Sequence, residues 1–539
     1  MPSFFKQKKN NKDRRNKRDN RPSPSIDCSL DANLAHIKQK TGNSADVITR
    51  TLTVGNEFKT DIALVYVDGI VDSQSINDFL IEAILEKHEL NEKLMQQEAF
   101  NVMKEGVVAV GSVKPIKDWD ELFSSLMSGE TIIFIDKVNG ALSADTKGGE
   151  RRSIEEPTTQ VNIMGPKVGF TESLGTNMAM VRRIIKNTNV WVEPLKVGKV
   201  TNTDVTIMYI NGIANEKIIK EVRERLKSID IDSVLDSGYI EVFIEDEATT
   251  PFPTLYRAER PDVVASNLLE GRIAIFVDGS PFVLVVPAVF VQFFQTADDY
   301  YFRSDIATSL RFLRVLIFII SIFAPALYIA ATTFHHEMIP TKLLIVIAAQ
   351  RETVPFPAFF EAVLMEVTFE ILREAGVRLP KPVGTAVSIV GALVVGQAAV
   401  EAGVVSAAMV IIVAITAIAN FATPNFAMAI SLRLLRFGFM IAAATFGIYG
   451  IVLGGILLMV HLSSLRSFGV PYMTPLSPFI PGNTDDTVVR LPLWKFNKRP
   501  ELIADNDNLT RQGENQMPGP DDKRGMINSS LDKDDRNES

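Results

Sequence analysis

Acidic side chains stand inside a long apolar stretch in the second half of this 539-residue chain. The stretch from Lys342 to Arg373 contains Glu361, Glu366 and Glu370. A carboxylate that faces lipid is energetically costly, so these side chains must face protein, water or lipid headgroups. Glu366, Glu370 and Arg373 follow at spacings of four and three residues, which places them on one helical face and permits an ion pair within the helix. The sequence therefore predicts an intramembrane cluster of these four charged side chains, either in a water-lined cavity or on an amphipathic helix at the membrane surface.

A second set of polar side chains lies in the nearly uncharged run from residue 381 to residue 403, where Gln397 and Glu401 are the strongly polar interior residues. Small residues recur every four positions along this run, at Gly384, Ser388, Ala392 and Gly396. One face of the predicted helix can therefore approach another helix closely.

In an oligomer, this helix could surround an axis and line a pore. Val394 and Val395 would then form a hydrophobic constriction, and Glu401 would form an acidic ring that favours cations. We take Val394, Val395, Gln397 and Glu401 as the candidate pore or gate residues. A tightly packed bundle helix without a pore is the competing interpretation.

The segment that leads into the membrane is broken by prolines and charged at its edge. From Gly279 to Ala297 the chain is uncharged and contains Pro281 and Pro287. This pattern predicts an interfacial or re-entrant element that joins a soluble domain to the bilayer, and the arginines beside the first span indicate a cytosolic side. The residues predicted to couple the soluble domain to the membrane are Asp298, Asp299, Tyr300, Arg303, Arg311 and Arg314.

Charge divides the chain into soluble and membrane parts. Charged residues crowd positions 1–280 and 481–539, and long uncharged runs lie between them. Because a bilayer core requires about 20 apolar residues per helix, we expect a membrane domain over residues 281–480 with about four to six helices, including re-entrant or interfacial segments.

Both ends of the chain are polar. The first 24 residues carry nine Lys or Arg against two Asp, with no apolar segment behind them, which is not the pattern of a secretory signal peptide. We expect a basic disordered arm over residues 1–49, either attracted to anionic lipid or simply solvated. Residues 481–539 are predicted to form a polar tail, disordered after LPLWKFNKRPE. The single cysteine, Cys28, excludes a disulfide framework and a cysteine-based metal site.

The soluble half contains an internal repeat. TDIALVYVDGIV, from Thr60, aligns with TDVTIMYINGIA, from Thr203, at an offset of 203 − 60 = 143 residues. A second pair, GETIIFID from Gly129 and EGRIAIFV from Glu270, follows at an offset of 270 − 129 = 141. Runs rich in β-branched residues before an Asp-Gly or Asn-Gly turn indicate strands that lead into helices. The predicted fold is therefore an α/β region of two similar subdomains, at 50–160 and, with a connector, at 161–280, followed by an α-helical polytopic membrane domain.

No pattern in the sequence indicates catalysis. The Val-Asp-Gly turns follow strands, but the chain has no phosphate-binding glycine motif and no base or metal cluster beside the turn carboxylates. We interpret these turns as structural and expect no enzymatic activity, cofactor, metal or nucleic-acid partner.

Several blocks of the chain closely resemble the A subunits of spore-germination nutrient receptors, the GerA family. ERPD, LLEGRIAI, VDGSPF and DDYY occur in that order from Glu259, as they do in the family. The connector carries a second match, with an EP-x-T element, a GP-x-x-GF turn and an N-x-x-x-x-R-R-x-I helix that ends in a basic stripe. Met164 and Gln160 depart from the family pattern, in which a basic and an acidic residue are usual, so no salt bridge is carried over at these positions.

The resemblance implies a subunit of a nutrient germinant receptor in the inner membrane of an endospore. It implies partners as well: a transporter-like B subunit that binds the nutrient, a lipoprotein C subunit, membrane lipid, and further copies of the chain in a homo-oligomeric ring that conducts monovalent cations. Two alternatives remain open. One is a non-conducting scaffold or a germination-amplifying paralogue; the other is a secondary transporter, for which the membrane half lacks an inverted repeat.

Overall fold

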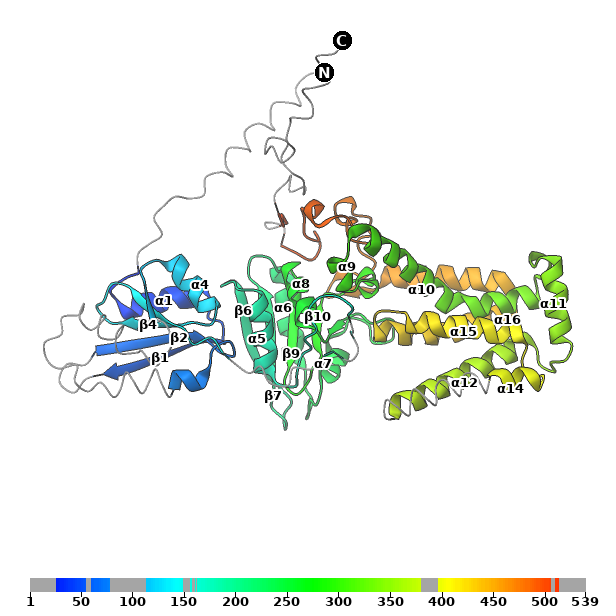
Figure 1. Ribbon diagram of the computed structural model, residues 1–539, viewed down its shortest axis with the longest axis horizontal. Coiled ribbons are helices and arrows are strands. Elements are labelled where there is room, and N and C mark those ends of the chain that lie inside the picture. Colours follow the sequence, from blue (N-terminus) through cyan, green and yellow to red (C-terminus); the bar gives the residue numbers. More distant parts are fainter. Residues whose placement is uncertain are drawn as a thin grey trace, which may run out of the picture. The chain divides into compact units, whose positions relative to one another are not determined.

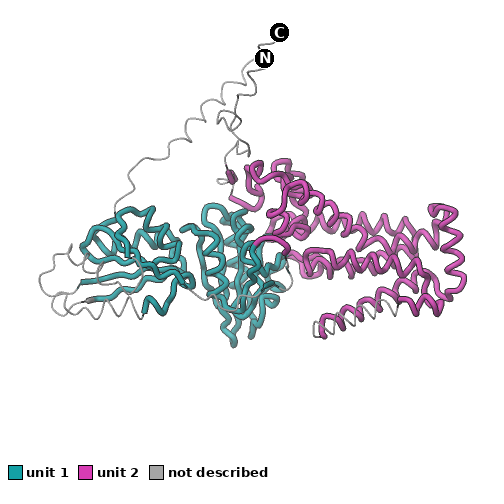
Figure 2. Tube along the Cα trace, in the orientation of Figure 1, with its two compact units in different colours: residues 1–161, 166–245, 255–287 teal, residues 162–165, 246–254, 288–539 magenta. Residues whose placement is uncertain are grey.

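The computed structural model describes residues 26–54, 60–77, 113–148, 156–157, 160, 162–379, 396–505 and 509–512. The chain forms two compact units (Figure 2). Unit 1 takes residues 1–161, 166–245 and 255–287, and unit 2 takes residues 162–165, 246–254 and 288–539.

Unit 1 contains two five-stranded antiparallel sheets of the same topology (Figure 1). The first has the order β1-β2-β4-β5-β3 and is built from β1 (Val47–Val54), β2 (Thr60–Val67), β3 (Val113–Ile116), β4 (Thr131–Ile135) and β5 (Ala141–Ala144). The second has the order β6-β7-β9-β10-β8 and is built from β6 (Val190–Val197), β7 (Thr203–Ile210), β8 (Tyr256–Ala258), β9 (Ile273–Val277) and β10 (Val283–Val286). The two segments of each sequence repeat occupy matching places, β2 with β7 and β4 with β9.

The turns after β2 and β7 explain the repeated glycine. Gly69 and Gly212 both have φ of 78°, a left-handed conformation that glycine adopts without steric cost. At Gly69 a side chain would also collide with its surroundings, because an added Cβ would lie 2.8 Å from the Cβ of Ala179.

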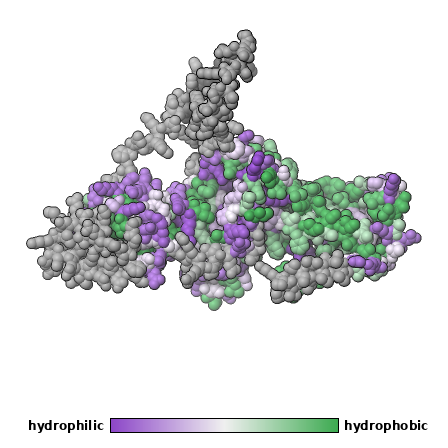
Figure 3. Space-filling view, in the orientation of Figure 1, coloured by the Kyte–Doolittle hydropathy of each residue, from purple (hydrophilic) through white to green (hydrophobic). Residues whose placement is uncertain are grey.

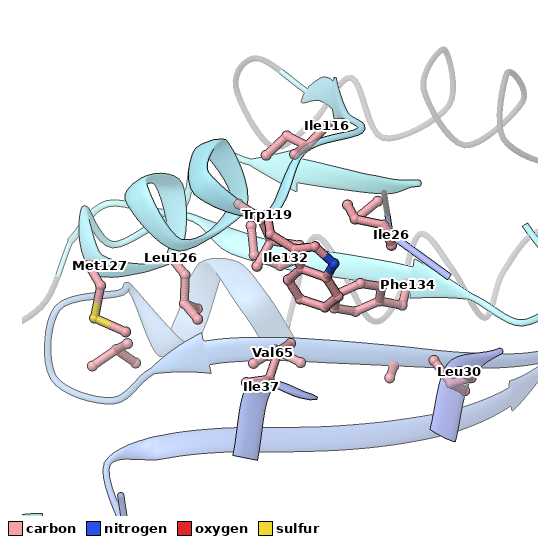
Figure 4. Close-up of a cluster of buried hydrophobic side chains, with 14 of the residues drawn as sticks. Ile26, Leu30, Ile37, Val65, Ile116, Trp119, Leu126, Met127, Ile132 and Phe134 are labelled. Carbon is pink, nitrogen blue, oxygen red and sulfur yellow. The ribbon is translucent and has the colours of Figure 1, made fainter. Parts of the chain in front are cut away.

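Helices accompany both sheets. With the first lie α1 (Leu30–Lys40) and α4 (Trp119–Met127). With the second lie α5 (Leu174–Ile184), α6 (Glu216–Ser228), α7 (Ser237–Ile244) and α8 (Pro261–Leu269). The core beneath α1 and α4 joins Trp119 and Phe134 to aliphatic residues from the strands (Figure 4).

The predicted disordered arm over residues 1–49 is wrong in its second half. Ser29 caps α1 by accepting a hydrogen bond from the backbone N–H of Ala32, and Leu30 and Ile37 are buried in the core of the first sheet. Ile26, also buried, joins the same core (Figure 4). The basic composition that suggested disorder belongs to the first 24 residues, whereas apolar residues at helical spacing begin at Leu30.

The predicted interfacial element at 279–297 is also corrected. Its first part forms β10, which pairs with both β9 and β8 and is buried on all four residues. The element in unit 2 is shorter, a 3₁₀ helix named η2 (Phe290–Phe294). A run of four apolar β-branched or leucine residues suits a buried strand as well as a membrane element, which is why composition alone misplaced it.

Unit 2 is mainly helical, and apolar side chains cover much of the helices that are visible (Figure 3). Among the described residues, its helices are α9 (Asp298–Tyr301), α10 (Ser304–Thr333), α11 (Thr341–Arg351), α12 (Ala358–Arg378), α14 (Gly396–Glu401), α15 (Ala407–Phe421) and α16 (Phe426–Ser464). In the part of the chain that the structure describes, α10 and α16 are long and apolar enough to cross a membrane.

Helix α16 is in fact two helices that turn back on each other. Gly447 has φ 61° and ψ −142°, far from helical values. Beyond it, a Cβ on Gly454 would lie 2.8 Å from Cε1 of Phe439, and one on Gly450 would collide with the carbonyl oxygen of Ala442. Residues 426–446 and 448–464 therefore pack as an antiparallel hairpin, and the glycines permit this close approach.

We expect Gly447→Ala to destabilise this hairpin. A backbone with positive φ and extended ψ is nearly restricted to glycine and costs another residue roughly 1–3 kcal/mol. The added Cβ would also lie 2.7 Å from Cε1 of His335. Gly455→Ala is the matched control, because nothing lies within 4 Å of a Cβ there and alanine favours a helix interior by roughly 0.5–1 kcal/mol. Thermal unfolding of the detergent-solubilised chain should show a lower midpoint for the first variant only; equal midpoints would contradict the hairpin turn.

Candidate functional site: coupling residues and membrane glutamates

A buried ionic network lies where the chain enters α10. Asp299 and Arg311 are 0% and 1% exposed. Arg311 donates from Nε to Asp299 Oδ2 at 2.9 Å, and Arg314 donates from Nη1 to both oxygens of Asp299 at 2.8 Å. One carboxylate therefore binds two arginines from successive turns of α10, which fixes α9 against the start of the helix.

The C-terminal segment completes this network. Asp486 accepts hydrogen bonds from Arg311 Nη1 at 2.8 Å and from the hydroxyl of Tyr300 at 2.6 Å. Arg490 donates to the carbonyl oxygen of Phe302 at 3.2 Å, and its guanidinium lies 5.8 Å from the centre of the Tyr300 ring. We call the six residues Asp299, Tyr300, Arg311, Arg314, Asp486 and Arg490 the Asp299 network.

The electrostatics of the Asp299 network favour an ionised carboxylate. Burial by itself raises the pKa of Asp299, but the hydrogen bonds and charges of Arg314 and Arg311 outweigh it, so the pKa lies below its ordinary value. Asp299 is therefore charged at neutral pH, and its charge holds the network together.

Four of the six coupling residues predicted from sequence meet in this network. Asp298 acts separately, because its carboxylate accepts hydrogen bonds from the backbone N–H groups of Ile163 at 3.3 Å and Met164 at 3.1 Å. Arg303 forms an exposed pair with Asp305 at 3.3 Å, the kind of surface ion pair that contributes little. The prediction for Arg303 has no support in its contacts.

Sequence reasoning missed Asp486 and Arg490 because both lie in the segment predicted to be a polar tail. Residues 481–505 are described and contain turns, two short 3₁₀ helices and the buried side chain of Arg490. Mixed charges beside apolar residues in TDDTVVRLPLW were the available signal, but a lone acidic residue in a polar segment does not identify its partner.

Loops from the α/β half extend the coupling region of unit 2. In residues 246–254, the hydroxyl of Thr250 lies 2.9 Å from Nε2 of His461, and the carbonyl of Pro251 accepts a hydrogen bond from Ser431. The same loop accepts hydrogen bonds from Ser467, to Thr254 O, and from Tyr472, to Pro253 O. The loop thus contacts both helices of the α16 hairpin at their open ends. Nothing in the sequence distinguished it from an ordinary surface loop.

The chain passes between the two units five times, because residues 162–165 and 246–254 belong to unit 2 although the sequence around them belongs to unit 1. Both segments form hydrogen bonds within unit 2. Residues 162–165 bond to Asp298, and residues 246–254 bond to α16.

Glu361, the first glutamate of the predicted membrane cluster, is fully buried. Its Oε2 accepts a hydrogen bond from the backbone N–H of Ser406 at 2.9 Å, and its Oε1 lies 3.5 Å from Nε of Arg351. The side chain links the end of α11 and the start of α12 to the start of α15.

Glu366 is 2% exposed and pairs with Arg436 from α16 at 2.5 Å. Arg436 also donates from Nε to the carbonyl oxygen of Ser321 in α10 at 2.8 Å. This contact joins three helices at a buried ion pair, with each charge compensated.

Glu370 forms the ion pair within α12 that its spacing from Arg373 predicted, and a second pair with Arg433 of α16 at 3.3 Å. The side chains of the two arginines are 24% and 13% exposed. The predicted cluster therefore exists as three separate ion-pair sites along α12.

Glu401 differs from these three glutamates. It is exposed and accepts a hydrogen bond from Nε2 of Gln397, one helical turn earlier in α14, at 2.8 Å. Among the described residues no Lys or Arg forms an ion pair with it. Val394 and Val395, the predicted constriction, lie outside the described residues.

The membrane glutamates thus separate into two kinds. Glu361, Glu366 and Glu370 are neutralised by arginines and hold helices together, so they are poorly suited to binding a mobile cation. Glu401 carries a charge with no arginine partner in the described part of the chain, and an exposed carboxylate beside apolar helices must meet water or another protein surface.

A doubled α/β region is followed by helices joined by buried ion pairs, and two of the described helices are long and apolar enough to cross a membrane. This arrangement indicates a membrane-associated protein. The profile of the family described as Bacillus/Clostridium GerA spore germination protein matches residues 35–502, and the chain belongs to that family.

Relatives of the chain carry names that agree with this assignment. It is 56% identical over 512 residues to Spore germination protein KA of Bacillus subtilis, covering 95% of this chain and 93% of that one. It is 45% identical over 482 residues to the uncharacterized membrane protein YfkQ of the same organism, covering 89% and 92%. Among solved structures, the chain is similar to the N-terminal domain of the A subunit of the Bacillus megaterium spore germinant receptor GerK3, with 49% sequence identity and a TM-score of 0.41. The match covers 51% of this chain and all of that domain.

Proposed function

We propose that the chain is the A subunit of a spore nutrient germinant receptor and triggers germination in response to nutrients such as amino acids or sugars. Membership of the GerA family over residues 35–502 supports this proposal. The partners follow from the same family: a transporter-like B subunit that binds the nutrient and a lipoprotein C subunit, all in the spore inner membrane.

Within that receptor, the chain acts as an ion-release subunit. The observation that carries this step is the contrast between Glu401 and the other membrane glutamates: three are neutralised by arginine, whereas Glu401 is exposed and bonded to the neutral Gln397. In a homo-oligomeric ring, repeated Glu401 side chains would form an acidic ring that attracts monovalent cations. Val394 and Val395, a few residues earlier, would form the constriction.

The coupling contacts provide a route from nutrient binding to the pore. A neighbouring subunit that shifts the α/β subdomains would pull on residues 162–165 and 246–254, which are held by Asp298, Ser431 and His461. The Asp299 network fixes the start of α10 against the C-terminal segment, so the helices would respond as one body rather than individually.

Germination of spores that lack this chain tests the receptor proposal. Spores of the bacterium that encodes it should lose the response to at least one amino acid or sugar when the gene is deleted, and regain it when the gene is restored. Release of cations should be lost and regained together with germination. Normal responses to a broad panel of nutrients after deletion would contradict the proposal, and lost germination with intact cation release would favour a scaffold.

A further inference from the structure

The outer edge of the first sheet carries hydrogen-bonding groups that face away from the sheet. β1 lies at the edge beyond β2 (Figure 1). The backbone N–H of Asp68 donates to the carbonyl of Asp46, and the register pairs Val47 with Val67. Because antiparallel pairs alternate between bonded and non-bonded, the even-numbered residues of β1 bond to β2 and the odd-numbered ones face outward.

The outward positions in the middle of β1 are Thr49, Thr51 and Thr53. Thr51 and Thr53 are exposed, and Thr49 is half-buried. Among the described residues, the backbone groups of these three threonines have no hydrogen-bond partner outside the strand. A strand of eight residues whose edge is unpaired among the described residues is a template for pairing with another strand.

In the second sheet, which has the same topology, the corresponding edge strand β6 is not free to pair with another strand. Its edge strand β6 pairs with β7 in the register that β1 uses with β2, shifted by 143 residues, so Val192, Pro194 and Lys196 match Thr49, Thr51 and Thr53. The N–H of Val192 donates to Ser44 Oγ, and its carbonyl accepts from the N–H of Ala45.

At the other two matched positions of β6, the residue types themselves hinder pairing with another strand. Pro194 has no N–H to offer, and Lys196 places an exposed charge on the edge. All three outward positions of β6 are thus blocked, by hydrogen bonds, by proline and by an exposed charge. At each matched position, β1 has threonine, a residue that favours strands. The difference indicates that the β1 edge is kept available for pairing.

We propose that β1 pairs with β1 of a second copy of this chain, antiparallel and about a two-fold axis at Thr51. The strand is self-complementary in this register, because Thr51 faces Thr51 of the partner and Thr49 faces Thr53. The outward N–H and C=O groups of these three threonines therefore meet partners. Threonine pairs across strands are favourable. Arg50 faces Leu52, so no like charges oppose each other.

A two-fold contact closes after two copies. It therefore joins chains in pairs and differs from the contact that would build a ring. It does not depend on the proposed function.

Disulfide trapping tests the register in the full-length chain, because Cys28 is the single native cysteine and Cys28→Ser removes it. In that background, Thr51→Cys should form a covalent dimer under mild oxidation, since directly opposed residues have Cα atoms about 5.5 Å apart and disulfides span about 4.4–6.8 Å. Thr53→Cys is the matched control. Two copies of residue 53 would lie four residues apart along the strands, roughly 14 Å, so this variant should not crosslink with itself.

The variant with both Thr49→Cys and Thr53→Cys should dimerise, although each cysteine alone should not. Adding Thr51→Pro should abolish that crosslink while leaving thermal unfolding nearly unchanged, because β6 already tolerates Pro194 at the matched position. Equal crosslinking of Thr51→Cys and Thr53→Cys, or none from either, would overturn the proposal. If the proline variant fails to fold, the pattern from the cysteine variants still decides it.

Discussion

Replacing Arg436 by leucine is expected to destabilise the membrane unit more than any other single change proposed for it. The substitution leaves Glu366 buried at 2% exposure without its cation and removes the hydrogen bond to Ser321 that joins α16 to α10. Removing one partner of a buried ion pair costs about 3–5 kcal/mol. The midpoint of thermal unfolding in detergent, and the amount of chain in the membrane, should both fall sharply.

Two further variants test whether the loss of stability comes from the unpaired buried charge or from lost packing. Arg378→Leu removes an exposed pair with Glu374 on α12 and should change stability by less than about 1 kcal/mol. The double variant Glu366→Leu/Arg436→Leu should recover much of the loss, because it leaves no unpaired charge in the interior. A double variant as unstable as Arg436→Leu alone would show that packing, rather than charge, accounts for the loss.

Asp299→Asn should produce the second-largest effect and change how stability depends on pH. The amide cannot neutralise Arg311 and Arg314, which both donate to Asp299 in the parent, so we expect a loss of about 3 kcal/mol at neutral pH. Because the folded-state pKa of Asp299 lies below its ordinary value, its contribution is present above the ordinary carboxylate pKa and is lost as pH falls through the folded pKa.

Unfolding midpoints measured from neutral pH downward will test this assignment. The midpoint of the parent should fall at acidic pH. Asp299→Asn should have a lower midpoint than the parent at neutral pH, but its midpoint should fall less as the pH is lowered. Asp305→Asn is the control, since its pair with Arg303 is exposed on both sides. An Asp299→Asn profile parallel to that of the parent would mean that Asp299 does not hold the network together by its charge.

The sequence predicted best those features that depend on local pattern. The repeat identified β2 with β7 and β4 with β9, the glycine turns have the left-handed backbone expected of them, and the i, i+3 spacing of Glu370 and Arg373 gave a real ion pair. Each of these follows from residues close in the chain, so periodicity and spacing were sufficient.

Features that depend on distant partners could not be predicted. Glu366 pairs with Arg436 across 70 residues, and Arg311 pairs with Asp486 across 175. Composition made β10 look like a membrane element and made Asp486 look like part of a polar tail. In both cases the burial is set by neighbours brought together in the fold, which local composition does not encode.

Cation release from spores is the measurement that tests the central proposal most directly, because it reports the ion movement assigned to Glu401. Spores carrying Glu401→Gln should release cations more slowly after nutrient is added, and spores carrying Val395→Ala should release them without nutrient, at chain levels equal to those of the parent. Glu374→Gln, which alters an exposed glutamate on α12, should behave like the parent. Release unchanged in both the Glu401 and the Val395 variants, with germination still dependent on the chain, would contradict a pore lined by this segment.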